Sequence, residues 1–164
     1  MLLESIKVAG VVAAIALAAP AARAEAPAGH DHGAHHHDHG AAGATLQLNE
    51  GQKWKTDAVL KANMEALRDD LGGSIDAIHH RRFEPEQYRE LAATIEGRVT
   101  KIVSECKLAP AVDAQFHLLL PELFGGINAM KGDGDQRSGA VRILRALETY
   151  ARYFDHPGWK AIEH

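Results

Sequence analysis

The stretch that decides the fold is residues 85–103, which read PEQYRELAATIEGRVTKIV. Apolar side chains recur in it every three or four residues, the spacing that gathers side chains on one face of an α-helix. Pro85 stands where this helix would begin, a favoured place because the missing N–H of proline has no intrahelical partner in a first turn. The predicted buried face comprises Tyr88, Leu91, Ala92, Ile95, Val99, Ile102 and Val103.

A segment before this stretch and two after it show the same spacing. The first segment has a helix-start signal at Thr56 or Asp57, and Gly72-Gly73 is expected to bend or loosen its helix. Pro110 opens the next helix, in which Pro121 should cause a kink because it removes a backbone hydrogen bond. The predicted core positions are Val59, Leu60, Met64, Leu67, Leu71, Ile75 and Ile78 in the first helix, Val112, Phe116, Leu119, Leu120, Leu123, Phe124 and Ile127 in the third, and Val141, Leu144, Leu147, Tyr150, Ala151 and Phe154 in the fourth.

Short polar links separate these helices, the clearest being the glycine-rich stretch 131–135. No segment shows the period-two alternation of a β-strand. Four amphipathic helices joined by short links favour an antiparallel bundle. We therefore predict an all-α domain over residues 45–164, an up-down-up-down four-helix bundle.

The N-terminal residues 1–24 have the organisation of a secretory signal peptide. Lys7 precedes an uncharged apolar stretch from Val8 to Ala19, and Ala22-Arg23-Ala24 gives the small-residue pattern of a cleavage site. The apolar stretch is shorter than the roughly 20 residues that a membrane-spanning helix needs. The sequence therefore predicts export to the periplasm, cleavage after Ala24 and no stable membrane insertion afterwards.

Residues 25–44, EAPAGHDHGAHHHDHGAAGA, lack large apolar side chains and are predicted to be disordered. Neutral imidazole is the commonest protein ligand for Zn²⁺, Cu²⁺ and Ni²⁺, so this segment predicts the binding of one of these ions. Its alternative interpretation is a solvated spacer with incidental affinity for metals. The candidate ligands are His30, His32, His35, His36, His37 and His39.

A second candidate metal site lies at one end of the predicted bundle. Asp113 and His117 are four residues apart and share a helical face, Cys106 ends the preceding helix, and His156 follows the last one. Thiolate, imidazole and carboxylate groups form a ligand set suited to zinc or copper. The spacing is looser than in zinc motifs, so a structural role for these four residues is the favoured alternative.

The composition and motifs narrow the remaining functional classes. A formal net charge of −4 argues against general affinity for nucleic acid. No nucleophile elbow, phosphate-binding loop or paired-carboxylate pattern occurs, so the sequence favours a binding protein over an enzyme. Two alternatives stay open: a helical protein that binds a protein partner, and a b-type haem or redox carrier that uses Met64 and His117.

Several strings resemble a family of small exported bacterial proteins, the DnrO-like proteins. These strings are LNEGQKW at 48–54, CKLAP at 106–110 with Asp113 and His117, and FDHPGW at 154–159, and the resemblance covers about residues 46–159. It implies a helical fold, a histidine-bearing leader and an exported location, and it implies no mechanism. Pro121 departs from the family's usual third helix.

Overall fold

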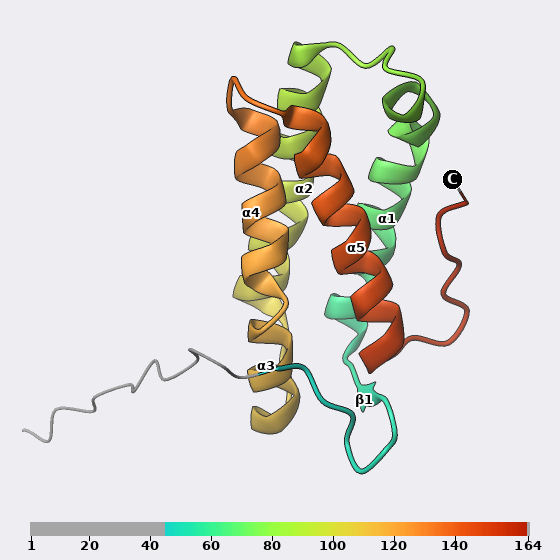
Figure 1. Ribbon diagram of the computed structural model, residues 1–164. Helices are drawn as coiled ribbons and strands as arrows, with labels where there is room; N and C mark the ends of the chain where they lie inside the picture. Colours follow the sequence, from blue (N-terminus) through green and yellow to red (C-terminus); the bar gives the residue numbers. More distant parts are fainter. Residues whose placement is uncertain (1–44, 164) are drawn as a thin grey trace, which may run out of the picture. The chain divides into compact units, whose positions relative to one another are not determined.

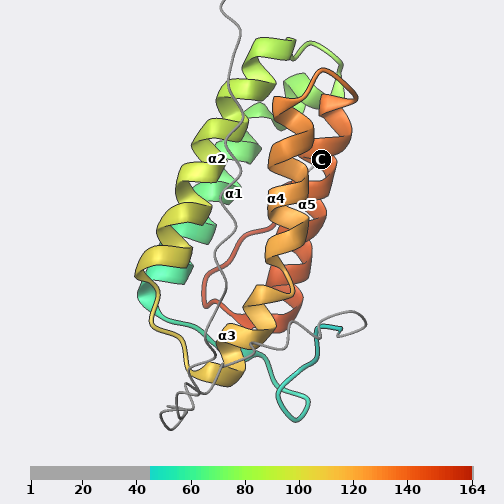
Figure 2. The ribbon, with the colours of Figure 1, turned by 90° about the vertical axis from the view of Figure 1, so that its left-hand side faces the viewer.

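The computed structural model describes residues 45–163, and these residues form an all-α domain, as the sequence predicts. The predicted signal peptide at 1–24 and the histidine-rich segment at 25–44 lie outside the described residues. Figures 1 and 2 show the long helices running alongside one another. The elements are β1 (Trp54–Lys55), α1 (Ala58–His79), α2 (Pro85–Glu105), α3 (Pro110–His117), α4 (Leu120–Lys131), α5 (Gln136–Tyr153) and β2 (Phe154–Asp155).

Helix α1 begins after Asp57, whose side chain accepts a hydrogen bond from the backbone N–H of Leu60. This confirms the predicted start, because an aspartate at this position satisfies an amide that has no partner within the helix. Helix α1 runs through Gly72 and Gly73 as one α-helix, so the two glycines do not end it. Packing therefore outweighs the low helix propensity of glycine here.

Helix α2 begins at Pro85 as predicted, and the buried stripe holds from Tyr88 to Ile102. Val103 departs from the prediction, because its side chain is 53% exposed. A helix turns about 100° per residue, so Ile102 and Val103 point in different directions, and at this end of α2 the core covers only Ile102. Ile102 is fully buried there.

The third predicted helix is two helices, α3 and α4, rather than one kinked helix. The chain turns at Leu118 and Leu119, and Pro121 falls in the first turn of α4, where its missing N–H has no cost. Phe124 was expected in the core but is 37% exposed, whereas its neighbour Leu123 is fully buried. Adjacent residues on a helix point about 100° apart, and here the core covers Leu123 and leaves Phe124 partly in solvent.

Two short strands that the sequence did not predict flank the helices. Trp54 pairs with Phe154 and Lys55 with Asp155 in a parallel arrangement. Two residues per strand are too few to show alternation in the sequence. The pairing holds the segment before α1 against the segment that follows α5.

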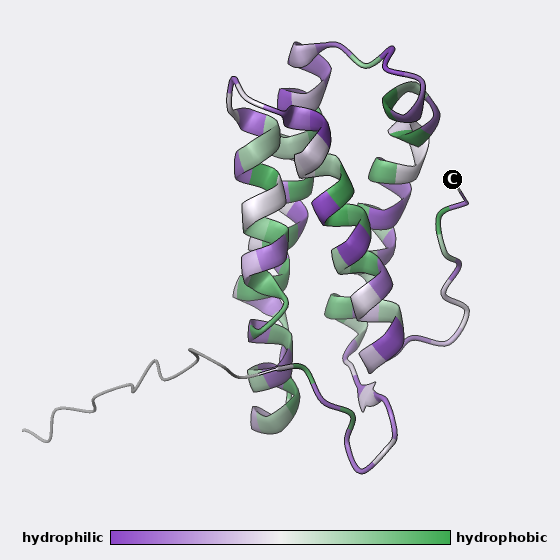
Figure 3. Cartoon of the chain, in the orientation of Figure 1, coloured by the Kyte–Doolittle hydropathy of each residue, from purple (hydrophilic) through white to green (hydrophobic). Residues whose placement is uncertain are grey.

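Each helix carries both hydrophobic and hydrophilic residues along its length (Figure 3). The apolar faces of the helices form one core. Helix α5 packs more closely against α4 than against α1. Gly126 and Gly139 lie at the α4–α5 contact, where a side chain on either residue would meet the opposite backbone. The wider space between α1 and α5 receives the chain after α5, as described below.

Candidate functional site

Cys106 caps the C-terminal end of α2 and is half-buried. Burial raises the pKa of its thiol, and the carboxylates of Asp57 and Asp113 raise that pKa further. The thiol form is therefore favoured over the thiolate, which is the form that ligates metals. The same neighbours show that Cys106 lies close to the N-terminal ends of α1 and α3.

Asp113 and His117 form the pair that their spacing predicts. His117 Nδ1 lies 2.9 Å from the backbone oxygen of Asp113 and 3.4 Å from its carboxylate Oδ2. Both side chains are largely exposed, at 46% for Asp113 and 59% for His117. Because Nδ1 faces Asp113, the Nε2 atom of His117 is the one placed to take another ligand.

His156 lies in a different environment from the other three candidates. Its Nδ1 atom is 3.1 Å from the hydroxyl of Tyr150, and its ring lies 5.0 Å from that of Trp159. Burial lowers its pKa, and Lys61 and Arg68 lower it as well, against opposing effects from Glu65 and Asp155. His156 is thus part of an aromatic cluster on the α1–α5 side.

The predicted four-residue metal site is not assembled in the described structure. Within residues 45–163, no three His, Cys, Asp or Glu side chains come together in a group that could hold a metal ion. The structure brings together Asp113 and His117, with Cys106 within electrostatic range of Asp113. The candidate ligands His30, His32, His35, His36, His37 and His39 lie outside the described residues.

The two residues considered for haem ligation also have different surroundings. Met64 is fully buried in the hydrophobic core, whereas His117 is exposed on α3. The structure therefore does not give the two side chains a common environment.

Asp57 is a central residue at this end of the domain that sequence reasoning identified only as a helix cap. Its Oδ1 atom accepts from Leu60 N at 2.7 Å, and its Oδ2 atom accepts from Lys107 N at 2.6 Å. One carboxylate therefore joins the start of α1 to the residue after the α2 cap. The CKL string at 106–108 indicated where the second helix ends, but nothing in the sequence indicated that Asp57 binds the backbone there.

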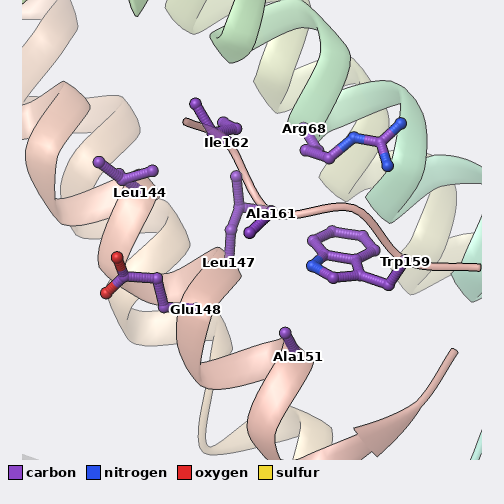
Figure 4. Close-up of a pocket in the computed structure, with 8 residues that line it drawn as sticks. All are labelled: Arg68, Leu144, Leu147, Glu148, Ala151, Trp159, Ala161 and Ile162. Carbon is purple, nitrogen blue, oxygen red and sulfur yellow. The ribbon is translucent and has the colours of Figure 1, made fainter. Parts of the chain in front are cut away.

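A groove between α1 and α5 is the second feature that the sequence did not predict. The segment after α5 lies in part of it, where Trp159, Ala161 and Ile162 line a small pocket of about 50 Å³ with residues of α5 and with Arg68 of α1 (Figure 4). The Arg68 guanidinium carbon lies 5.3 Å from the centre of the Trp159 ring. An open pocket of about 230 Å³ continues the groove and shares Leu144 and Glu148 with the first.

Comparison with known protein families, curated proteins and solved structures finds no match for the chain. None of the helices in residues 45–163 combines the length and the apolar character that crossing a membrane requires.

Proposed function

We propose that this protein binds transition-metal ions, Zn²⁺, Cu²⁺ or Ni²⁺, in the periplasm through its histidine-rich segment. The observation that carries the proposal is the run from His30 to His39, in which six of ten residues are histidines. Several imidazoles on a short chain can satisfy a metal ion in more than one arrangement. Such a segment favours capture of ions over selection among them.

We also infer that the four long helical segments follow an up-down-up-down order, with α3 and α4 together as the third. The connections between them are short, and α1 packs on α2, α2 on α4 and α4 on α5. Short connections favour antiparallel neighbours. In this arrangement the start of α1, the end of α2 and α3 share one end, as in Figure 1.

The test is a titration of residues 25–164 with each metal ion against a competing chelator. The main variant replaces all six histidines of His30–His39 by asparagine, which keeps the length and removes the ligands. We expect this variant to lose metal binding. Imidazole must be neutral to bind metal, so binding by the unaltered protein should weaken below about pH 6.

Two outcomes would contradict the proposal. If the asparagine variant binds as tightly as the unaltered protein, the site lies in the helical domain, and Cys106→Ser becomes the next variant. If neither protein competes with a weak chelator, the histidine-rich segment is a spacer. The alternative of a protein-binding helical domain, for which the open α1–α5 groove is the supporting observation, would then be favoured.

A further inference from the structure

The open half of the α1–α5 groove is an apolar pocket with no assigned occupant. Its apolar lining comprises the buried residues Ile78 and Leu144 and the half-buried residues Ile75 and Val141. Its volume of about 230 Å³ is below the roughly 300–1,000 Å³ of sites for drug-sized ligands. The size therefore suits one unbranched apolar chain better than a multi-ring compound.

The rim of this pocket carries more positive than negative charge. Arg137, Arg145 and His79 line this pocket but not the small pocket beside the C-terminal segment, whereas Glu148 lines both. Arg137 is held in place because its Nε atom donates to the backbone oxygen of Ile78 at 3.3 Å. Arg145 forms no ion pair within residues 45–163, so its guanidinium is available to an anion.

The occupied half of the groove shows what kind of group these helices accept. The Ile162 side chain lies over α1, with Cγ1 at 3.7 Å from the position that a Cβ atom on Gly72 would take. Ala161 and Ile162 also line the small pocket beside Leu144 and Leu147 (Figure 4). The groove therefore already holds aliphatic side chains on a narrow, extended segment.

From these features we propose that the pocket binds an anionic amphiphile with a single medium-length alkyl chain. The alkyl chain lies over Ile78 and Leu144, and the acidic head group lies against Arg145. Burial of the alkyl chain supplies the driving force, and the guanidinium selects the sign of the head group. This binding is independent of the metal binding proposed above.

Calorimetric titration of the protein, residues 25–164, with decanoate tests the proposal. A metal chelator is present throughout, so that metal carboxylate complexes contribute nothing. We expect saturable binding of one decanoate, and binding of decyltrimethylammonium, which has the same chain length and the opposite charge, at least tenfold weaker. Equal affinity for the two amphiphiles would overturn the proposal.

Two variants locate the site, and a third controls for charge. Val141→Trp fills the pocket from a half-buried position and should abolish decanoate binding, whereas Arg145→Glu should weaken it at least tenfold. Arg152→Glu makes the same charge change on an exposed position of α5 outside the pocket lining and should leave binding unchanged. Thermal unfolding monitored by circular dichroism verifies that each variant is folded.

The proposal is wrong if Arg145→Glu and Arg152→Glu weaken binding equally, because the effect then reflects net charge. It is also wrong if folded Val141→Trp retains full affinity. Binding of an acidic amphipathic peptide without any binding of decanoate would identify the groove as a protein-docking surface instead.

Discussion

Gly126 of α4 and Gly139 of α5 lie so close that a Cβ atom on Gly139 would be 2.6 Å from the backbone oxygen of Gly126. The same Cβ atom would lie 2.8 Å from the backbone nitrogen of Met130. Both obstacles are backbone atoms, which cannot move without shifting the helix. This contact draws α5 toward α4, and the space on the other side of α5 is the groove that the C-terminal segment enters.

Gly139→Ala should therefore destabilise the protein, although alanine normally favours a helix. We expect a loss of about 1–3 kcal/mol in the free energy of unfolding, typical of overpacking in a tight contact. Urea denaturation measures it. The control is Gly97→Ala in α2, where a Cβ atom would meet nothing within 4 Å, and this variant should gain about 0.5–1 kcal/mol. A Gly139→Ala variant as stable as the parent would show that α4 and α5 are farther apart than described.

Asp57 joins two helices, so its loss should cost more than that of an ordinary helix cap. Asp57→Ala removes the acceptor of both Leu60 N and Lys107 N. We expect a loss of about 2 kcal/mol, from about 1 kcal/mol for the cap and a similar amount for the second donor. Thermal and urea unfolding both report this loss.

Asp135→Ala is the matched control, because Asp135 caps α5 through a single bond from Ser138 N at 3.1 Å. It should cost about 1 kcal/mol. Equal losses in the two variants would mean that the bond from Lys107 contributes nothing to stability.

The sequence predicted those parts of the fold that depend on local patterns. The stripes of α1 and α2, the cap at Asp57 and the helix starts at Pro85 and Pro110 all follow from spacing within a few residues. Adjacent apolar pairs such as Ile102 and Val103 were misjudged, because the pattern does not say which member faces the core. The break at Pro121 was expected as a kink, since a proline signal does not by itself decide between a bend and a new helix.

The candidate site was less predictable because its contacts join distant parts of the chain. Asp113 and His117 pair through helical spacing, which a sequence shows directly. The position of His156 depends on the path of the chain after α5, which turns toward Tyr150 and Trp159. Ile162 and Gly72 are far apart in the sequence, so no local pattern predicts the contact between them.

The stability of the protein should depend on pH through His156. Burial raises the pKa of Tyr150, so its hydroxyl stays protonated, and it lies within hydrogen-bond distance of His156 Nδ1. The folded-state pKa of His156 lies below its ordinary value of 6.5. Below about pH 6.5 the unfolded chain therefore binds more protons than the folded one, and the free energy of unfolding decreases until the folded ring is also protonated. Well above pH 6.5, where the ring is neutral in both states, this residue contributes no pH dependence.

Urea denaturation between pH 7.5 and 5.5, with a chelator present, measures this effect. His156→Asn should flatten the profile, because asparagine does not titrate. His117→Asn, at an exposed position on α3, is the control and should leave the contribution of His156 intact. A profile unchanged by His156→Asn would show that this imidazole is as well solvated in the folded protein as in the unfolded chain.

The C-terminal segment should stabilise the domain through Trp159. Its ring lies under the Arg68 guanidinium and 5.1 Å from the ring of Tyr150, and the Lys160 backbone oxygen accepts a hydrogen bond from Arg68 at 3.4 Å. Trp159→Ala removes the aromatic contacts and uncovers part of the groove beside Leu147. We expect a loss of about 2 kcal/mol, below the 3–5 kcal/mol of a fully buried tryptophan because Trp159 is only half-buried. Trp159→Phe keeps most of the apolar contact and should lose less than half as much.

Limited proteolysis gives a second readout, since a segment released from the groove would be cut after Lys160 faster in Trp159→Ala than in the parent. If Trp159→Ala changes neither the stability nor the rate of cleavage, the segment does not occupy the groove in solution.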